Sequence, residues 1–168
     1  MLPALLKVFL ARPRQSSLHI CGYGKGKEEI AALCAHRPQV RLYAPRRPDE
    51  CLEFARTCDV LINPRPIAQG NENNLPSKVF EYALSGRAIL SSRLSGVDVV
   101  LGDQAFYFDE HDFDASLDRA LEKVEAVSRS ELNRRGAAIQ ARVLANYAWA
   151  QQAERIAKFV QRVATGFS

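Results

Sequence analysis

The chain has 168 residues, of which 47% are apolar and 25% are charged, and its formal net charge is +4. This length suits one domain, 1–168, with its own core, and the composition excludes a disordered chain. The mild positive charge suits an anionic ligand such as a nucleotide, but no basic run with interleaved aromatic residues indicates a nucleic-acid-binding surface. The cysteines lack both C-x-x-C pairing and metal-ligand spacing, so we expect reduced thiols in a cytoplasmic protein.

The first residues, MLPALLKVFL, have helical spacing. Leucines and Phe9 fall on one helical face, Lys7 interrupts the apolar run, and no small-residue cleavage site follows. We therefore expect an amphipathic helix rather than a signal peptide. No stretch is long and apolar enough to predict a transmembrane helix.

Short apolar runs then alternate with helical patterns. We expect strands at 17–21, 39–43, 58–63, 87–91 and 105–108, and helices at 27–36, 48–57 and 76–85. Near-continuous apolar strands separated by helices predict a parallel sheet covered on both faces. The part from 113 to 168 has helical patterns only. Its last stripe, which includes Trp149, Ile156 and Val160, either packs on its own domain or docks a partner domain.

A glycine-rich turn follows the first strand. In CGYGKGK, residues 21–27, Gly22 and Gly24 fit the start of the dinucleotide fingerprint G-x-G-x-x-G, but Lys27 occupies the third glycine position. A phosphate site and a simple tight turn both remain open. A second motif, DEHDFD at 109–114, resembles the D-x-D metal motif of some sugar-transferring enzymes, but Asp112 or Asp114 as a helix N-cap is the better interpretation. We expect no metal.

The most informative stretch is NENNLPSKVFEYALSG, residues 71–86. Pro76 suits the first position of a helix, and the free N–H groups that follow, at Ser77 and Lys78, favour an anion. Glu81 lies on the same face as Lys78, opposite an expected core face of Val79, Phe80, Ala83 and Leu84. A carboxylate can accept both hydroxyls of a ribose. These residues fit a nucleoside diphosphate, or an ordinary amphipathic helix with a charged outer face.

These residues also carry a resemblance. The segments CDVLINPRP and NENNLPSKVFEYALSGRAIL, together with LHICGYGKGKEEI and NYAWAQQAERI, resemble in order the carboxyl-terminal half of retaining glycosyltransferases of the GT-B fold, family-4-like. The most specific piece runs from Asn73 to Tyr82. The resemblance implies a Rossmann-like three-layer α/β domain that binds a nucleoside diphosphate sugar without a cofactor or metal.

The resemblance also implies roles for single residues. Glu81 matches the glutamate that holds the donor ribose, and Asn73 takes the place of a glutamate near the donor sugar. Lys78 and the backbone of Leu75, Pro76 and Ser77, with Asn74 beside them, would hold the diphosphate and stabilise the leaving group. Gly22 would lie near the phosphates, and the strand end at Tyr43 and Ala44 near the base. No general base is assigned.

The resemblance further implies that the acceptor-binding domain and the first strand of the donor domain are not encoded in this chain. We therefore expect strand order 2-1-3-4-5 in one five-stranded sheet, with the first-strand position between strands 1 and 3 closed or filled by another chain. The chain would be a split subunit, a truncated reading frame or a fragment. It would need an N-terminal acceptor-binding domain or partner chain, and any membrane association would be peripheral and through that domain.

The function implied is glycosyl transfer from a nucleoside diphosphate sugar to a hydroxyl acceptor, in polysaccharide or glycoconjugate synthesis, with the isolated chain inactive. One alternative is a non-catalytic nucleotide-binding module. Another is an NADP-binding Rossmann domain, in which Arg46 and Arg47 would meet a 2′-phosphate. The incomplete glycine fingerprint argues against the second alternative.

Overall fold

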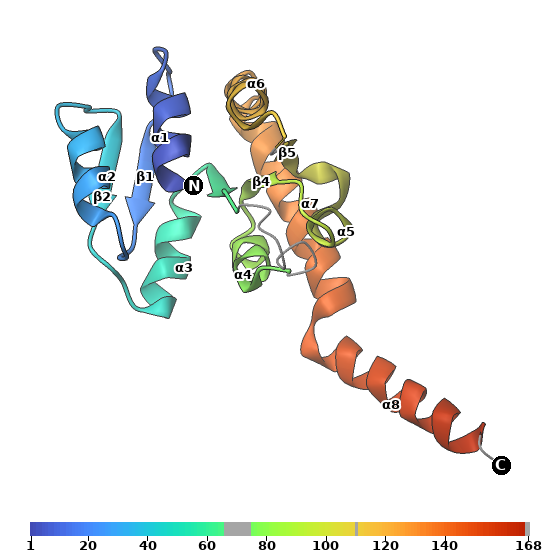
Figure 1. Cartoon of the computed structure of the whole chain (residues 1–168). Coiled ribbons are helices and arrows are strands. Elements are labelled where there is room, and N and C mark those ends of the chain that lie inside the picture. The colour runs from blue at the N-terminus through green and yellow to red at the C-terminus, as the bar shows by residue number, and fades with distance from the viewer. Residues whose placement is uncertain (66–74, 110, 167–168) are drawn as a thin grey trace.

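The structure is a computed structural model, and it describes residues 1–65, 75–109 and 111–166 (Figure 1). The elements are, in chain order, α1 (Leu2–Leu10), β1 (Leu18–Cys21), α2 (Lys27–Cys34), β2 (Val40–Tyr43), α3 (Pro48–Arg56), β3 (Val60–Asn63), α4 (Ser77–Leu84), β4 (Ala88–Ser92), α5 (Val97–Leu101), η1 (Gly102–Gln104), β5 (Phe106–Phe108), α6 (Phe113–Glu125), α7 (Arg129–Tyr147) and α8 (Trp149–Thr165). The predicted strands and helices are confirmed. The helix α5 and the 3-10 turn η1 lie where the sequence predicts no element.

The strands form two parallel sheets. β1 pairs with β2, with Leu18 opposite Val40, and β4 lies between β3 and β5, with Ile89 opposite Leu61. The parallel α/β architecture is therefore confirmed, but the expected single five-stranded sheet is wrong. Among the residues described, β1 and β3 do not pair.

The first helix, α1, packs on both sheets. Its side chains Leu5, Leu6 and Phe9 are buried in a cluster that takes Leu18 from the first sheet and Phe108 from the second. α1 also contacts both α2, which covers the first sheet, and α6, which packs on β5 (Figure 1). α1 therefore lies in the middle of this helix layer and links the two sheets through one apolar cluster.

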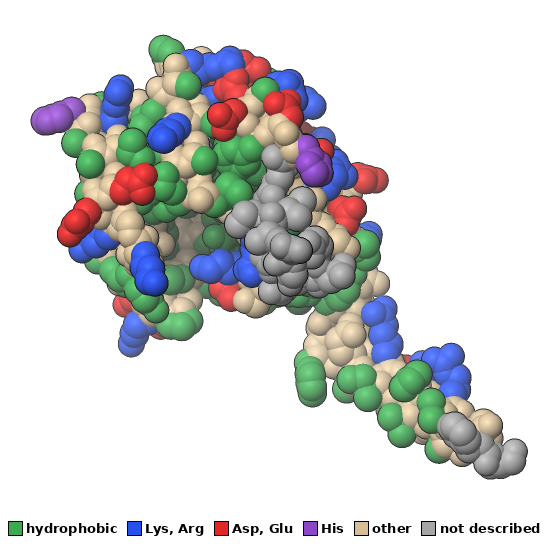
Figure 2. All heavy atoms as spheres, viewed as in Figure 1, with side chains coloured by type: hydrophobic (Ala, Val, Ile, Leu, Met, Phe, Trp, Pro, Cys, Tyr) green, Lys and Arg blue, Asp and Glu red, His purple; other side chains and the backbone are tan. Residues whose placement is uncertain are grey.

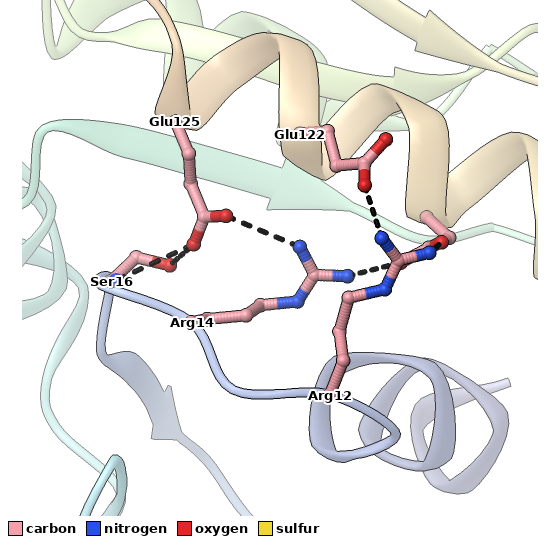
Figure 3. Close-up of polar contacts among 6 residues, drawn as sticks. Arg12, Arg14, Ser16, Glu122 and Glu125 are labelled. Carbon is pink, nitrogen blue, oxygen red and sulfur yellow. Dashed lines mark hydrogen bonds and ion pairs between the residues drawn. The ribbon is translucent and has the colours of Figure 1, made fainter.

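Two arginines tie the segment after α1 to α6 (Figure 3). The guanidinium of Arg14, only 1% exposed, forms ion pairs with Asp118 and with Glu125. Arg12, which is 47% exposed, pairs with Asp118 and Glu122. A buried charge is tolerated only when it is paired and hydrogen-bonded, so these contacts fix α6 against the entry to β1.

A second cluster covers the other face of the three-stranded sheet. It joins Val79 and Ala83 of α4 to Ile89 of β4 and Ile139 and Val143 of α7. Ser128 is the N-cap of α7, and its hydroxyl accepts a hydrogen bond from the Glu131 backbone N–H at 3.2 Å. This cluster holds α4 beside the sheet.

The last helix, α8, extends away from the body of the molecule (Figures 1 and 2). None of its described residues is buried. Its apolar side chains stay exposed, Trp149 at 80% and Phe159 at 61%. The stripe therefore does not pack on its own domain in this structure. In the described part of the chain, no helix has the length and hydropathy needed to cross a bilayer.

Candidate functional site at the carboxyl ends of the strands

Parallel strands bring their carboxyl ends to the same side. β1 ends at Cys21, directly before Gly22, and β2 ends at Tyr43, directly before Ala44. β3 ends at Asn63, and the next helix along the chain is α4. Ligands of open parallel α/β sheets bind beyond these ends. The described site residues named from the sequence thus lie at the strand ends or on the helix that follows.

The start of α4 has the features of an anion site. Pro76 is the N-cap residue, with φ −67° and ψ 129°, and no described side chain caps the helix. Ser77 and Lys78 are both exposed, whereas Pro76 is buried. The first N–H groups of a helix have no intrahelical partner, and the helix dipole favours negative charge there. Lys78 adds a full positive charge at the same end.

Lys78 and Glu81 lie one turn apart on the exposed side of α4. Val79 and Ala83, on the opposite side, are completely buried. No described residue forms an ion pair with either charged side chain. The predicted core face is only partly correct, because Leu84 is 39% exposed. α4 is therefore amphipathic, with a charged pair available on its outer face.

The orientation of α4 is set by α7. The side-chain amide of Gln140 donates a hydrogen bond to the Leu84 carbonyl at 2.7 Å. Gly86 follows with φ +71°, a left-handed conformation that favours glycine. Gly136 of α7 approaches this turn so closely that a Cβ at Gly136 would lie 2.2 Å from the Gly86 oxygen. α4 thus ends in a rigid contact that fixes the direction of its start.

A buried polar cluster, which the sequence analysis does not identify, joins the ends of β3 and β4. Asn63 donates a hydrogen bond from its side-chain amide to the Ser91 hydroxyl at 2.9 Å. The Ser92 hydroxyl donates to the Arg65 carbonyl at 2.8 Å, and the Arg65 N–H lies 3.2 Å from the same hydroxyl. Ser91 and Ser92 are completely buried. In the sequence, this cluster could have been recognised from the polar residues that end two otherwise apolar strands, VLIN and AILSS.

The glycine-rich turn after β1 is open on the outside. A Cβ added at Gly22 or at Gly24 would meet no atom of the described residues within 4 Å. Gly26, with φ +88°, is the N-cap of α2, which like α4 has no side-chain cap among the described residues. The turn therefore does not need glycine to relieve crowding within the chain, which leaves room for a ligand.

The aromatic ring of Tyr43 packs against other residues of the fold. The ring stacks on His19 with centroids 5.5 Å apart, and its hydroxyl lies 3.0 Å from His19 Nδ1. Phe54 of α3 packs against the same ring, with centroids 4.7 Å apart, and the Arg46 guanidinium lies 4.8 Å from the Phe54 centroid. The Tyr43 side chain is therefore occupied by contacts within the fold, whereas the next residue, Ala44, is exposed.

The remaining residues named in the sequence analysis lie outside the described residues or form contacts other than those expected. Asn73 and Asn74 lie outside the described residues. Asp112 is the N-cap of α6 by position, but its carboxylate pairs with Arg119 at 2.9 Å instead of capping the helix. Arg47, one of the arginines considered for a 2′-phosphate, pairs with Asp49 at 3.1 Å.

Comparison with known proteins identifies the family. A family model described as "Glycosyl transferase-like" matches residues 6–158. The chain belongs to this glycosyl transferase-like family. A search of curated proteins finds no match.

Solved structures show the same fold. Anabaena Alr3699/HepE in complex with UDP-glucose matches with a TM-score of 0.70 at 13% identity, over 94% of this chain and 44% of that one. The same protein with UDP and glucose matches with a TM-score of 0.69. TarM matches with a TM-score of 0.67 at 14% identity, over 94% of this chain and 31% of that one. The chain thus has the fold of a GT-B glycosyltransferase domain and spans less than half the length of these proteins.

For a glycosyl transferase-like domain, the chemistry of α4 is informative. A helix start that no described side chain caps, with an adjacent lysine, attracts negative charge. A carboxylate one turn further along can accept hydrogen bonds from vicinal hydroxyls. The described residues therefore include groups suited to the two polar parts of a nucleoside diphosphate.

Proposed function

We propose that this chain is the donor-binding half of a retaining GT-B glycosyltransferase, which transfers a sugar from a nucleoside diphosphate sugar to a hydroxyl acceptor in polysaccharide or glycoconjugate synthesis. The observation that carries the proposal is the start of α4, where Lys78 and Glu81 are exposed beyond the strand ends while Val79 and Ala83 are buried. The likeness to a fold solved with UDP-glucose supports it.

In this proposal the N–H groups at the start of α4 and the Lys78 ammonium bind the diphosphate. Both are sources of positive charge at one end of one helix, so they offset the charge that forms when the glycosyl bond breaks. No metal is needed for this step. Leu75, Pro76 and Ser77 supply the backbone of the cradle, and Gly22 lets the opposite wall approach the phosphates.

Glu81 binds the ribose in this proposal. Hydrogen bonds to a charged group contribute about 1.5–3 kcal/mol, so Glu81→Ala should weaken UDP binding roughly ten- to a hundredfold. Lys78→Ala should weaken UDP more than UMP, and this loss should shrink as salt rises, because exposed charges are screened. Calorimetric titration of UDP, GDP, ADP and UMP measures both effects.

The chain supplies a matched control. Glu154 and Lys158 of α8 form an exposed ion pair at 2.5 Å on a helix that projects from the body. Glu154→Ala and Lys158→Ala change the same charges away from α4, so they should leave nucleotide affinity unchanged. If the α4 and α8 variants bind UDP equally well, or if the α4 variants lose their fold, the charged face of α4 is an ordinary solvated surface.

The second half of the active site belongs, in this proposal, to an acceptor-binding domain outside this chain. The exposed apolar stripe of α8, which includes Trp149, Ile156 and Val160, suits contact with that domain. The purified chain alone should therefore transfer no sugar at a measurable rate, because half the cleft that excludes water and positions the acceptor is not present.

A turnover assay with the purified chain tests this expectation. Robust transfer by the 168 residues alone would contradict it. Adding an acceptor-binding domain in trans distinguishes an enzyme subunit from a non-catalytic nucleotide-binding module: the former gains transfer activity, and the latter binds nucleotide without turnover.

A further inference from the structure

The strand β5 lies at the outer edge of the three-stranded sheet. It pairs with β4 on one side, and within the described ranges no strand pairs with its other side. The Arg93 N–H donates to the Phe108 carbonyl at 3.0 Å, so the backbone groups of Phe108 face β4. Successive residues of a strand direct their N–H and C=O groups to opposite sides, so those of Tyr107 point away from the sheet. The outer edge of β5 therefore offers a donor and an acceptor to a further strand.

The residues of β5 do not protect this edge. Proteins commonly protect an edge strand with a charged side chain or a proline in the strand. β5 consists of Phe106, Tyr107 and Phe108, so it has neither. The next outward N–H, that of Asp109, donates to the Ser116 hydroxyl of α6 at 2.6 Å. The open part of the edge is therefore centred on Tyr107.

A groove of about 470 Å³ follows this edge, and Tyr107 lines it. Its two walls are the elements that cover the two faces of the sheet at β5: α5 with η1 on one face, and α6 on the other (Figure 1). Val97 of α5 is buried in the cluster of Ile89, whereas Leu117 of α6 is buried in the cluster of Leu90. The volume lies within the range of clefts that hold ligands.

The two walls carry opposite charges. Asp98 and Asp103 line the groove from α5 and η1, and Lys123 lines it from α6. Among the described residues, none of these three side chains forms an ion pair. Val99, which also lines the groove, leaves an apolar side chain 60% exposed. Arg93 adds a positive charge beside the end of β5, where its guanidinium lies 4.6 Å from the centroid of the Tyr107 ring.

We propose that this groove binds an extended segment of a partner protein, with alternating basic and acidic side chains, as a strand added beside β5. Successive side chains of a strand point to opposite faces. In such a segment the basic side chains face Asp98 and Asp103, and the acidic side chains face Lys123. Main-chain hydrogen bonds to Tyr107 provide affinity, and the charged walls select the sequence. The proposal is independent of nucleotide binding at α4.

The test uses the peptide Thr-Lys-Glu-Lys-Glu-Lys-Thr, labelled with fluorescein, and the full chain without nucleotide. Fluorescence anisotropy should show half-saturation below about 1 mM. In a strand, side chains on one face belong to residues whose N–H groups share one edge, so the lysines and the glutamates use opposite edges. Two further peptides carry N-methyl groups on all the lysines or on both glutamates, which removes the donors of one edge.

Only one of the two N-methylated peptides should bind at least about tenfold more weakly than the parent, because only one edge of the added strand meets β5. Hydrogen exchange gives a second measurement. The parent peptide should slow exchange of the Tyr107 amide by at least about tenfold and leave the Phe106 and Phe108 amides, which face β4, unchanged. Equal affinity of the two N-methylated peptides, or no protection at Tyr107, would overturn the proposal.

A charge reversal tests the wall that α6 provides. Lys123→Glu should weaken the parent peptide at least about threefold. It should leave the binding of Thr-Lys-Gln-Lys-Gln-Lys-Thr, which has no acidic side chain to meet Lys123, unweakened. The matched control is Lys158→Glu on the projecting helix α8, which should leave both affinities unchanged. The proposal is wrong if Lys158→Glu has the same effect as Lys123→Glu, or if the glutamine peptide is weakened as much as the parent.

A second copy of this chain is the other possible occupant of the groove. In that case the chain alone should dimerise, and dilution to the monomer should speed exchange of the Tyr107 amide. That result would overturn the proposal of a partner protein. A chain that stays monomeric, with a rapidly exchanging Tyr107 amide until the peptide is added, would support it.

Discussion

Replacing Gly136 by alanine tests the contact that fixes α4 and β4 against α7. The added methyl carbon would lie 2.2 Å from the Gly86 oxygen, 2.5 Å from the Arg87 carbonyl carbon and 2.8 Å from the Ala88 nitrogen. These are backbone atoms next to a completely buried strand, so they cannot move aside as a flexible side chain would.

The expected magnitude follows from two opposing effects. Overpacking against a rigid backbone costs about 3 kcal/mol. Alanine in the middle of a helix is more favourable than glycine by about 1 kcal/mol. The net loss of unfolding free energy is about 2 kcal/mol, which for a chain of this length lowers Tm by about 4–8 °C. Urea unfolding and calorimetry measure both quantities.

The neighbouring exposed residue Ala137 provides the control. Ala137→Gly changes helix propensity alone and should cost about 1 kcal/mol. If propensity governed Gly136 too, Gly136→Ala would raise Tm. A variant as stable as the unmodified chain, or more stable, would therefore refute the close contact between α7 and the Gly86 turn.

Arg14→Met should lower the unfolding free energy by about 2–3 kcal/mol, somewhat less than the loss of a fully buried pair, because Asp118 and Glu125 remain 18% and 22% exposed. Arg12→Met, at a 47% exposed guanidinium, should lower it by less than about 1 kcal/mol. Equal losses in chemical denaturation would contradict the assignment of Arg14 as the buried partner. Burial, with Asp98 nearby, raises the pKa of Tyr107 to about 12 from 10, so the stability that its neutral hydroxyl contributes is complete below pH 10 and is lost between about pH 10 and 12. Tyr107→Phe should flatten this decline in urea titrations at pH 9 and pH 11, and an unchanged slope would be the contrary result. Ser128→Ala removes the N-cap of α7 and should lower the unfolding free energy by about 1 kcal/mol, whereas Ser128→Asp should preserve it.

The candidate site was largely predictable where it depends on neighbouring residues. Lys78 and Glu81 are three positions apart, so any helix through 76–85 places them on one face, and the buried Val79 and Ala83 confirm which face is inside. Leu84, at the end of the helix, departs from this pattern and is 39% exposed. The buried Ser91 and Ser92 were not identified, since the residues of and after β3 that their hydroxyls contact are 27 or 28 positions away.

Alternating apolar runs and helical patterns in the sequence determined which segments are strands and which are helices, because hydrophobic periodicity is a local property of the chain. Only the tertiary structure decided how those strands combine. The structure divides the strands into two sheets that α1 joins by contacting both α2 and α6, and the burial of Arg14 depends on acids more than a hundred residues away. Such contacts arise from the width and shape of packed layers, which no local pattern records.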